Sequence, residues 1–214
     1  MRSPLLGIVA SALLLAGPAA RAADLAPAPL PATWFGVGGG IAVSSIPMAF
    51  LRVEGVARRG PFQVSLAAEG GPPVMDQAYV EPEPGETVVS RREVYLLAAA
   101  GGELPVSGLL GGGWLSHHAH VDLLGELGWQ HTALAIQQYG LADVEASRWT
   151  PVAGARLGLG FRLGTSIPAD LGVTVYGRLP LHERGCVPTL AGCEEMGEAA
   201  AGVALWGRVD FPAR

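Results

Sequence analysis

Three histidines within four residues, His117, His118 and His120, form the pattern in this chain that most suggests chemistry. Imidazole nitrogen is a common ligand of transition-metal ions, and in an extended strand His118 and His120 share one face. Asp122 follows on that face, but His117 points away and no cysteine lies nearby to complete a ligand set. We therefore expect a solvated turn here, and we predict no metal, no cofactor and no catalytic residue.

Ionisable residues recur at alternate positions of several segments, opposite apolar ones. In 120–131, valine, leucine and tryptophan alternate with polar residues that include Asp122 and Glu126, and 149–163 repeats the pattern. A period of two is that of a β-strand, whose successive side chains point to opposite faces. Both segments exceed ten residues, which is long for a strand of a soluble protein.

The composition indicates which solvent the apolar faces meet. Of 214 residues, 50% are hydrophobic and 15% charged, and mean hydropathy is +0.34. After residue 16, no apolar run approaches the ~20 residues of a membrane helix. Alternating segments of about 10 residues are instead typical of transmembrane β-barrels. The net charge of -5 gives no basis for binding nucleic acid.

The N-terminus predicts export. Arg2, the apolar run 5–16 and an A-x-A site form a secretory signal peptide, which we place at residues 1–22. The Pro/Ala-rich stretch 23–32 reads as an extended linker. The remainder, 33–214, is predicted to be one barrel domain.

The fold class that we predict is all-β, an eight-stranded antiparallel up-and-down transmembrane β-barrel. The expected strands cover 34–45, 48–58, 62–69, 91–101, 120–131, 149–163, 170–181 and 199–211. Long connections alternate with short turns, as expected when long loops face outside and short turns face the periplasm. We treat 102–119 as a turn because a further strand would make the count odd. Closure leaves no unpaired strand edge in the lipid.

The polar faces are expected to meet in the barrel interior as an ionic network, because the lumen of eight strands is just wide enough for side chains to fill it. Its predicted members are Arg52, Glu54, Glu93, Asp122, Glu126, Arg156, Arg162, Arg178, Glu198 and Arg208, with Arg58, Tyr176 and Asp210 on the same faces. Buried charges need partners. Adjacent strands suggest the pairs Glu126–Arg156 and Arg178–Glu198, and a core without a continuous pore. A gated narrow channel is the alternative.

Two further features concern the ends of the strands. Cys186 and Cys193 enclose six residues, and in an exported chain such a pair favours a disulfide that closes a small loop. Aromatic residues gather near predicted strand ends, where barrels place interfacial girdles, although strand propensity alone could explain them. They are Trp34, Phe35, Trp129, Tyr139 and Trp149.

The mature chain resembles the small eight-stranded outer-membrane barrels of the OmpA-like and OmpX-like kind. The resemblance rests on the signal Arg2–Ala22, the alternating strands and the terminal strand Ala199–Phe211. Such chains usually end on an aromatic residue, whereas Phe211 is followed here by three more residues. The resemblance implies a monomer in outer-membrane lipid with its termini in the periplasm.

Three functions follow from these expectations. The first is a non-catalytic barrel with a structural role, or with a role in recognising an extracellular ligand or surface through loops 70–90 and 182–196. The second is a lipid-modifying enzyme. The lipid A 3-O-deacylases use a His-x-Ser pair, but this chain has His131-Thr132-Ala133. The third is a soluble periplasmic barrel around a small apolar ligand, which would reverse the two faces of every strand.

Overall fold

The computed structural model describes residues 33–45, 49–71, 84, 87–106, 118–163, 169–189 and 192–212. The predicted signal peptide, the linker and most of the predicted loop 70–90 lie outside these ranges. The strands are β1 (Thr33–Ser44), β2 (Ala49–Arg59), β3 (Phe62–Gly70), β4 (Thr87–Pro105), β5 (Ala119–Gln138), β6 (Val144–Leu163), β7 (Ala169–Pro180), β8 (Gly185–Thr189), β9 (Gly192–Met196) and β10 (Ala200–Pro212). Within the described ranges, no helix is long and apolar enough to cross a membrane.

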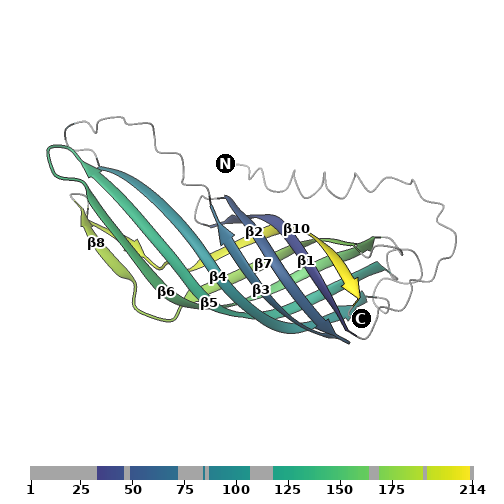
Figure 1. Cartoon of the computed structure of the whole chain (residues 1–214). Coiled ribbons are helices and arrows are strands. Elements are labelled where there is room, and N and C mark those ends of the chain that lie inside the picture. The colour runs from purple at the N-terminus through teal and green to yellow at the C-terminus, as the bar shows by residue number, and fades with distance from the viewer. Residues whose placement is uncertain are drawn as a thin grey trace.

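Eight of these strands form a closed antiparallel barrel, which confirms the predicted fold class. The order around the barrel is β1-β10-β7-β6-β5-β4-β3-β2, so each strand pairs with its neighbours along the chain and β10 closes onto β1 (Figure 1). The other two strands, β8 and β9, pair only with each other. Closure satisfies the backbone hydrogen bonds of both terminal strands of the barrel, so neither is left as an edge.

Three strands are longer than the sequence pattern indicated. β4, β5 and β6 continue beyond the end of the barrel at which β10 begins, which we call the mouth. Only residues 139–143 separate β5 from β6, so the predicted connection 137–147 was too long. The reason is a change in pattern. Beyond His131 the inward face turns apolar, with Leu134 and Ile136 buried, while the outward face becomes more polar. The alternation that marked the barrel wall therefore stops before the strand does.

These overhanging segments, 87–93 of β4, 132–138 of β5 and 144–148 of β6, form a three-stranded sheet that we call the extension. The β8–β9 hairpin lies beside it (Figure 1). Val187 and Met196 of the hairpin pack against Leu134 and Ile136 of β5 in a small apolar core. The predicted cysteine loop is thus an ordered hairpin that covers the inner face of the extension.

The predicted disulfide between Cys186 and Cys193 is present, with the two Cα atoms 5.7 Å apart. Removing it with Cys186→Ser and Cys193→Ser should destabilise the hairpin by about 2 kcal/mol, because a short closed loop loses its constraint in the unfolded state. We expect trypsin to cut faster after Arg184 in the detergent-folded variant, while the thermal unfolding of the barrel stays unchanged. Cleavage after Arg59, in the turn between β2 and β3, is the internal control. Equal rates after Arg184 would contradict this prediction.

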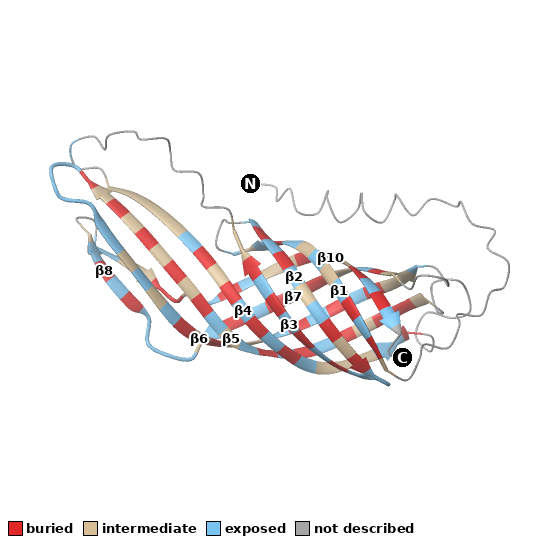
Figure 2. Ribbon diagram, viewed as in Figure 1, coloured by how far each residue is buried: buried red, intermediate tan, exposed pale blue. Residues whose placement is uncertain are grey.

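Along each barrel strand, buried and exposed residues alternate (Figure 2). The exposed positions carry large apolar side chains on every barrel strand, and they form an apolar belt around the outside. Its members include Phe35, Ile41, Leu51, Val53, Val64, Leu66, Leu96, Leu104, Leu123, Leu127, Leu157, Leu159, Leu171, Leu179, Leu205 and Phe211. The opposite faces carry most of the buried charged residues, so the barrel is charged inside and apolar outside.

The narrow interior needs glycines where large side chains cross a neighbouring strand. Gly172 on β7 pairs with Trp206 on β10, and a Cβ at Gly172 would come within 2.6 Å of the indole ring. The Trp206 indole also donates a hydrogen bond of 2.9 Å to the hydroxyl of Thr174. Glycine at 172 therefore makes room for an aromatic ring that fills the lumen.

Candidate functional site

Most of the charged side chains inside the barrel form two groups at different levels. The central layer contains Arg52, Glu54, Glu69, Glu126, Arg156 and Arg178. The terminal layer lies toward the end at which β1 begins and β10 ends, and contains Arg58, Glu103, His120, Asp122, Arg162, Asp170, Arg208 and Asp210. The central layer has three cations and three carboxylates, so its formal charges balance.

Arg178 on β7 is the most highly connected group of the central layer. Its two terminal nitrogens donate to both oxygens of Glu69 at 2.6 and 2.9 Å, and Nε donates to Glu126 at 2.9 Å. The guanidinium also lies over the rings of Tyr95 and Tyr176, at 5.0 and 4.4 Å from their centroids. Bidentate, charge-assisted contacts of this kind are the stronger hydrogen bonds in proteins.

The other two arginines of the central layer both contact the remaining carboxylate, Glu54. Arg52 pairs with Glu69 and lies 3.2 Å from Glu54. Arg156 pairs with both oxygens of Glu54, at 3.0 Å to one of them, and donates to the hydroxyl of Ser65 at 2.9 Å. Because β2, β3, β5, β6 and β7 all contribute, the layer links opposite walls of the barrel.

Of the two ion pairs expected from strand adjacency, the structure contains one. Arg156 Nε and Glu126 lie 3.7 Å apart. Arg178 contacts carboxylates across the lumen rather than Glu198, which lies 3.3 Å from Arg91. Glu198 precedes the start of β10, and its carboxylate pairs with Arg91 of the extension instead of with the central layer.

Glu93, another predicted member of the network, also lies near the mouth and is fully buried. Arg91 donates to one oxygen at 2.6 and 2.8 Å, and the Tyr95 hydroxyl donates to the other at 2.8 Å. Gln130 in turn donates to the Tyr95 oxygen at 3.0 Å. These residues form a third polar cluster between the central layer and the apolar core under the hairpin.

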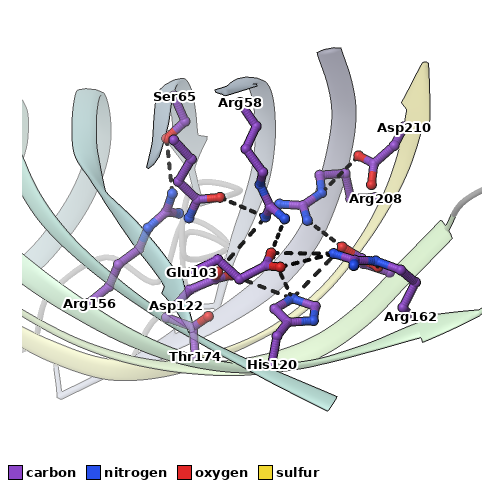
Figure 3. A network of polar contacts seen from close by, with 12 residues as sticks. Arg58, Ser65, Glu103, His120, Asp122, Arg156, Arg162, Thr174, Arg208 and Asp210 are labelled. Carbon is purple, nitrogen blue, oxygen red and sulfur yellow. Dashed lines mark hydrogen bonds and ion pairs between the residues drawn. The ribbon is translucent and has the colours of Figure 1, made fainter. Parts of the chain in front are cut away.

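The terminal layer contains several residues that the sequence reasoning left out of the network (Figure 3). Glu103 pairs with Arg58 and lies 3.1 Å from Arg162. Asp170 pairs with Arg208 and lies 3.4 Å from Arg162. Glu103 was missed because 102–119 was treated as a turn, whereas β4 continues to Pro105.

The other omissions had a signal in the sequence. Glu69 follows Gln63 and Ser65 on the polar face of its strand, and Asp170 stands at the predicted start of another. The solvated turn expected at the three histidines is wrong for His120, which is 2% exposed on β5 and shares the face of Asp122; His117 lies outside the described residues. Extending each alternation to its last polar residue would have placed all three inside the barrel.

Trp34 is inside the barrel, so its predicted place in an interfacial girdle is wrong. It is 2% exposed, and Arg58 and Arg208 lie 4.3 and 4.9 Å from its ring. The adjacent Phe35 is 55% exposed, because neighbouring residues of a strand face opposite sides. Trp129 and Trp149 are exposed near the edge of the belt, as a girdle requires, whereas Tyr139 is exposed in the turn between β5 and β6, beyond the extension and away from the belt.

A small cavity of about 30 Å³ lies inside the barrel. Its lining includes Asp122, Arg156, Tyr176 and Trp206, and thus side chains of both layers. Such a volume accommodates about one water molecule. Side chains therefore fill most of the interior at this level.

The arrangement of His131 and Thr132 does not suit a base and nucleophile. Thr132 is fully buried on the inner face of β5, whereas His131 lies on the outer face with its ring centroid 4.7 Å from that of Trp149. Consecutive strand residues point apart, so the hydroxyl and the imidazole cannot act on one substrate.

Comparisons with known proteins rest on structure alone, since no family model and no curated protein matches this chain. A major outer-membrane protein from Thermus thermophilus aligns with a TM-score of 0.54 at 13% identity, over 84% of this chain and all of the other. Two further structures align with lower TM-scores. The attachment invasion locus protein of Yersinia pestis has a TM-score of 0.48 at 10% identity, over 86% of this chain and 100% of the other. The N-terminal barrel domain of OprF from Pseudomonas aeruginosa has a TM-score of 0.46 at 9% identity, over 85% of this chain and 98% of the other. The chain has the fold of the small eight-stranded outer-membrane β-barrels.

Proposed function

We propose that this protein is an integral outer-membrane barrel whose lumen is sealed by its own ion pairs, and that it has no catalytic role. The apolar belt is the observation that carries the proposal. On β5 its outward residues run from Val121 to Trp129. Eight residue steps in a strand tilted by about 40° rise about 20 Å, close to the ~25 Å apolar band of outer-membrane barrels.

The belt also argues against a soluble barrel that holds an apolar ligand. That function needs leucine and valine inside and charges outside. Here Leu123 and Leu127 are 58% and 62% exposed, while Glu126 between them is 2% exposed. An apolar surface of this extent is stable in lipid and promotes aggregation in water.

Ion pairs that connect opposite walls support a sealed lumen. Arg178 and Glu69 come from β7 and β3, which are separated by three strands on either side of the ring. A sealed lumen offers no path to a substrate, and His131 and Thr132 face opposite sides. Both features favour a structural role over an enzymatic one.

Membrane fractionation and planar-bilayer recording test this proposal together. We expect the protein to remain in the membrane pellet after a carbonate wash and to migrate differently on gels before and after heating. We also expect no steady conductance step above the lipid baseline, because the central layer fills the lumen. Release by carbonate would refute the membrane location, and a stable open conductance would refute the seal.

The extension supports a surface role as the second part of this proposal. It stands beyond the belt and carries the disulfide-linked hairpin, so it would project from the membrane toward the medium. Ser147→Cys on the extension should react with a membrane-impermeant maleimide on intact cells. Arg59→Cys, at the last residue of β2 beside the turn at the opposite end, should react only after lysis. The reverse labelling pattern would contradict this orientation.

A further inference from the structure

The terminal layer contains a buried histidine between carboxylates, and the proposed function makes no use of it. We propose that Glu103, His120 and Asp122 bind a divalent first-row transition-metal ion inside the barrel. The three side chains each offer one ligand atom, and these atoms all lie within 4.8 Å of one another (Figure 3). The site differs from the sequence cluster His117–His120, since it takes one histidine and two carboxylates from neighbouring strands.

The ligand atoms lie somewhat farther apart than those of a zinc coordination sphere. His120 Nε2 lies 3.6 Å from Glu103 Oε2 and 3.8 Å from Asp122 Oδ2. These separations exceed those of a hydrogen bond. Two ligands at about 2.1 Å from a tetrahedral zinc ion lie about 3.4 Å apart, so small side-chain shifts would complete the site.

Buried polar atoms without hydrogen bonds at the same place indicate that the site lacks a bound ligand. His120 is 2% exposed, and neither ring nitrogen has a hydrogen-bond partner; Oδ1 of Asp122, which is 5% exposed, also lacks one. Buried polar atoms are nearly always hydrogen-bonded, because leaving them unpaired costs free energy. A metal ion bound to Nε2 and to the Asp122 carboxylate would stabilise both groups.

The strands hold the three ligands in place. Glu103 on β4 and Asp122 on β5 are register partners, and His120 lies two residues before Asp122 on the same face. Gly160 on β6 is the register partner of His120, and a Cβ at that position would overlap the imidazole ring. Ligands on paired strands are positioned more rigidly than ligands on loops.

The surrounding charge permits a cation despite the nearby arginines. The terminal layer has four carboxylates (Glu103, Asp122, Asp170 and Asp210) and three arginines (Arg58, Arg162 and Arg208), so its formal charge is -1 with a neutral histidine. Arg58 pairs with Oε2 of Glu103, the oxygen nearest His120, and Arg162 lies 3.1 Å from Oε1, so Arg58 would share Oε2 with the metal ion. Ligating carboxylates commonly have such outer partners, which orient them toward the metal.

One imidazole and two carboxylates suit zinc better than a soft ion such as Cu(I), which prefers sulfur ligands, or calcium, which takes only oxygen. Asp170 lies next to the three ligands, with Oδ2 3.8 Å from His120 Nε2. Its carboxylate or a water molecule would complete a four-coordinate zinc ion.

The test is calorimetric titration of Zn²⁺ into untagged, detergent-folded protein that has first been treated with a chelator. We expect one site, with affinity reduced at least about tenfold in His120→Asn and in Asp122→Asn. Titration with Co²⁺ should give the visible absorption of a tetrahedral ion, and both variants should lose it. His118→Asn and His131→Asn are the matched controls and should bind zinc like the original protein.

Heat-modifiable gel migration verifies that each variant is folded before titration. If His120→Asn does not fold, Asp122→Asn and Gly160→Ala decide the question, since alanine at 160 displaces the imidazole without removing a ligand. Absence of zinc binding by the unaltered protein would overturn the proposal. Equal zinc affinity in the original protein and in the folded variants would also overturn it, as would loss of binding in His118→Asn alone.

Discussion

Replacing Arg178 with methionine is expected to lower the free energy of unfolding by about 3–5 kcal/mol, the cost of breaking a buried ion pair by removing one partner. Arg178 is 2% exposed, and its guanidinium donates to both Glu69 and Glu126. Methionine fills similar volume but leaves two carboxylates buried without their shared cation. The measurement is urea-induced unfolding in detergent micelles, followed by tryptophan fluorescence.

The matched control for this variant is Arg184→Met. Arg184 pairs with Glu195 at 2.5 Å, but the two side chains are 52% and 43% exposed, and such surface pairs contribute about 0–1 kcal/mol. Adding Glu126→Gln to Arg178→Met should restore part of the loss, because the two remaining arginines, Arg52 and Arg156, then face two carboxylates, Glu54 and Glu69. If Arg178→Met and Arg184→Met had equal effects, the central layer would not stabilise the barrel.

Replacing Leu123 with arginine should cost about 2–4 kcal/mol in phospholipid vesicles, the range for arginine near the midplane on the lipid face of a barrel. Leu123 is 58% exposed and lies within the apolar belt, opposite Leu157 in the register. An arginine at this position would lose its hydration in the lipid without gaining an ion-pair partner. The measurement is denaturant-induced unfolding of the protein folded into vesicles.

Gln137→Arg is the control, since residue 137 lies on the same outward face of β5 but within the extension. We expect a change of about 0–1 kcal/mol there, because charged side chains near the interface cost little. If Leu123→Arg and Gln137→Arg had equally small effects in vesicles, the belt would not face lipid, and the membrane location would be refuted.

The alternation of polar and apolar residues along each strand was the part of the fold that could be predicted from the sequence. A period of two placed Asp122, Glu126 and Arg156 on one face and the leucines on the other, and the structure buries the first set. The pattern failed where its polarity changed. Leu134 and Ile136 turn inward beyond the barrel mouth, so β5 was predicted to end seven residues too early, at His131 instead of Gln138.

The sequence by itself determined the period of each strand, the contrast between its faces and the closely spaced cysteine pair, because each depends on residues a few positions apart. Only the tertiary structure decided which charges meet. Arg178 and Glu69 are 109 residues apart in sequence and lie on opposite walls, so their contact depends on closure and on the register of every strand between them. Closure likewise placed Trp34 between two arginines and gathered Glu103, His120 and Asp122 at one end of the lumen. No local pattern contains that information, because a strand's alternation shows which side chains point inward but not what they face across the barrel.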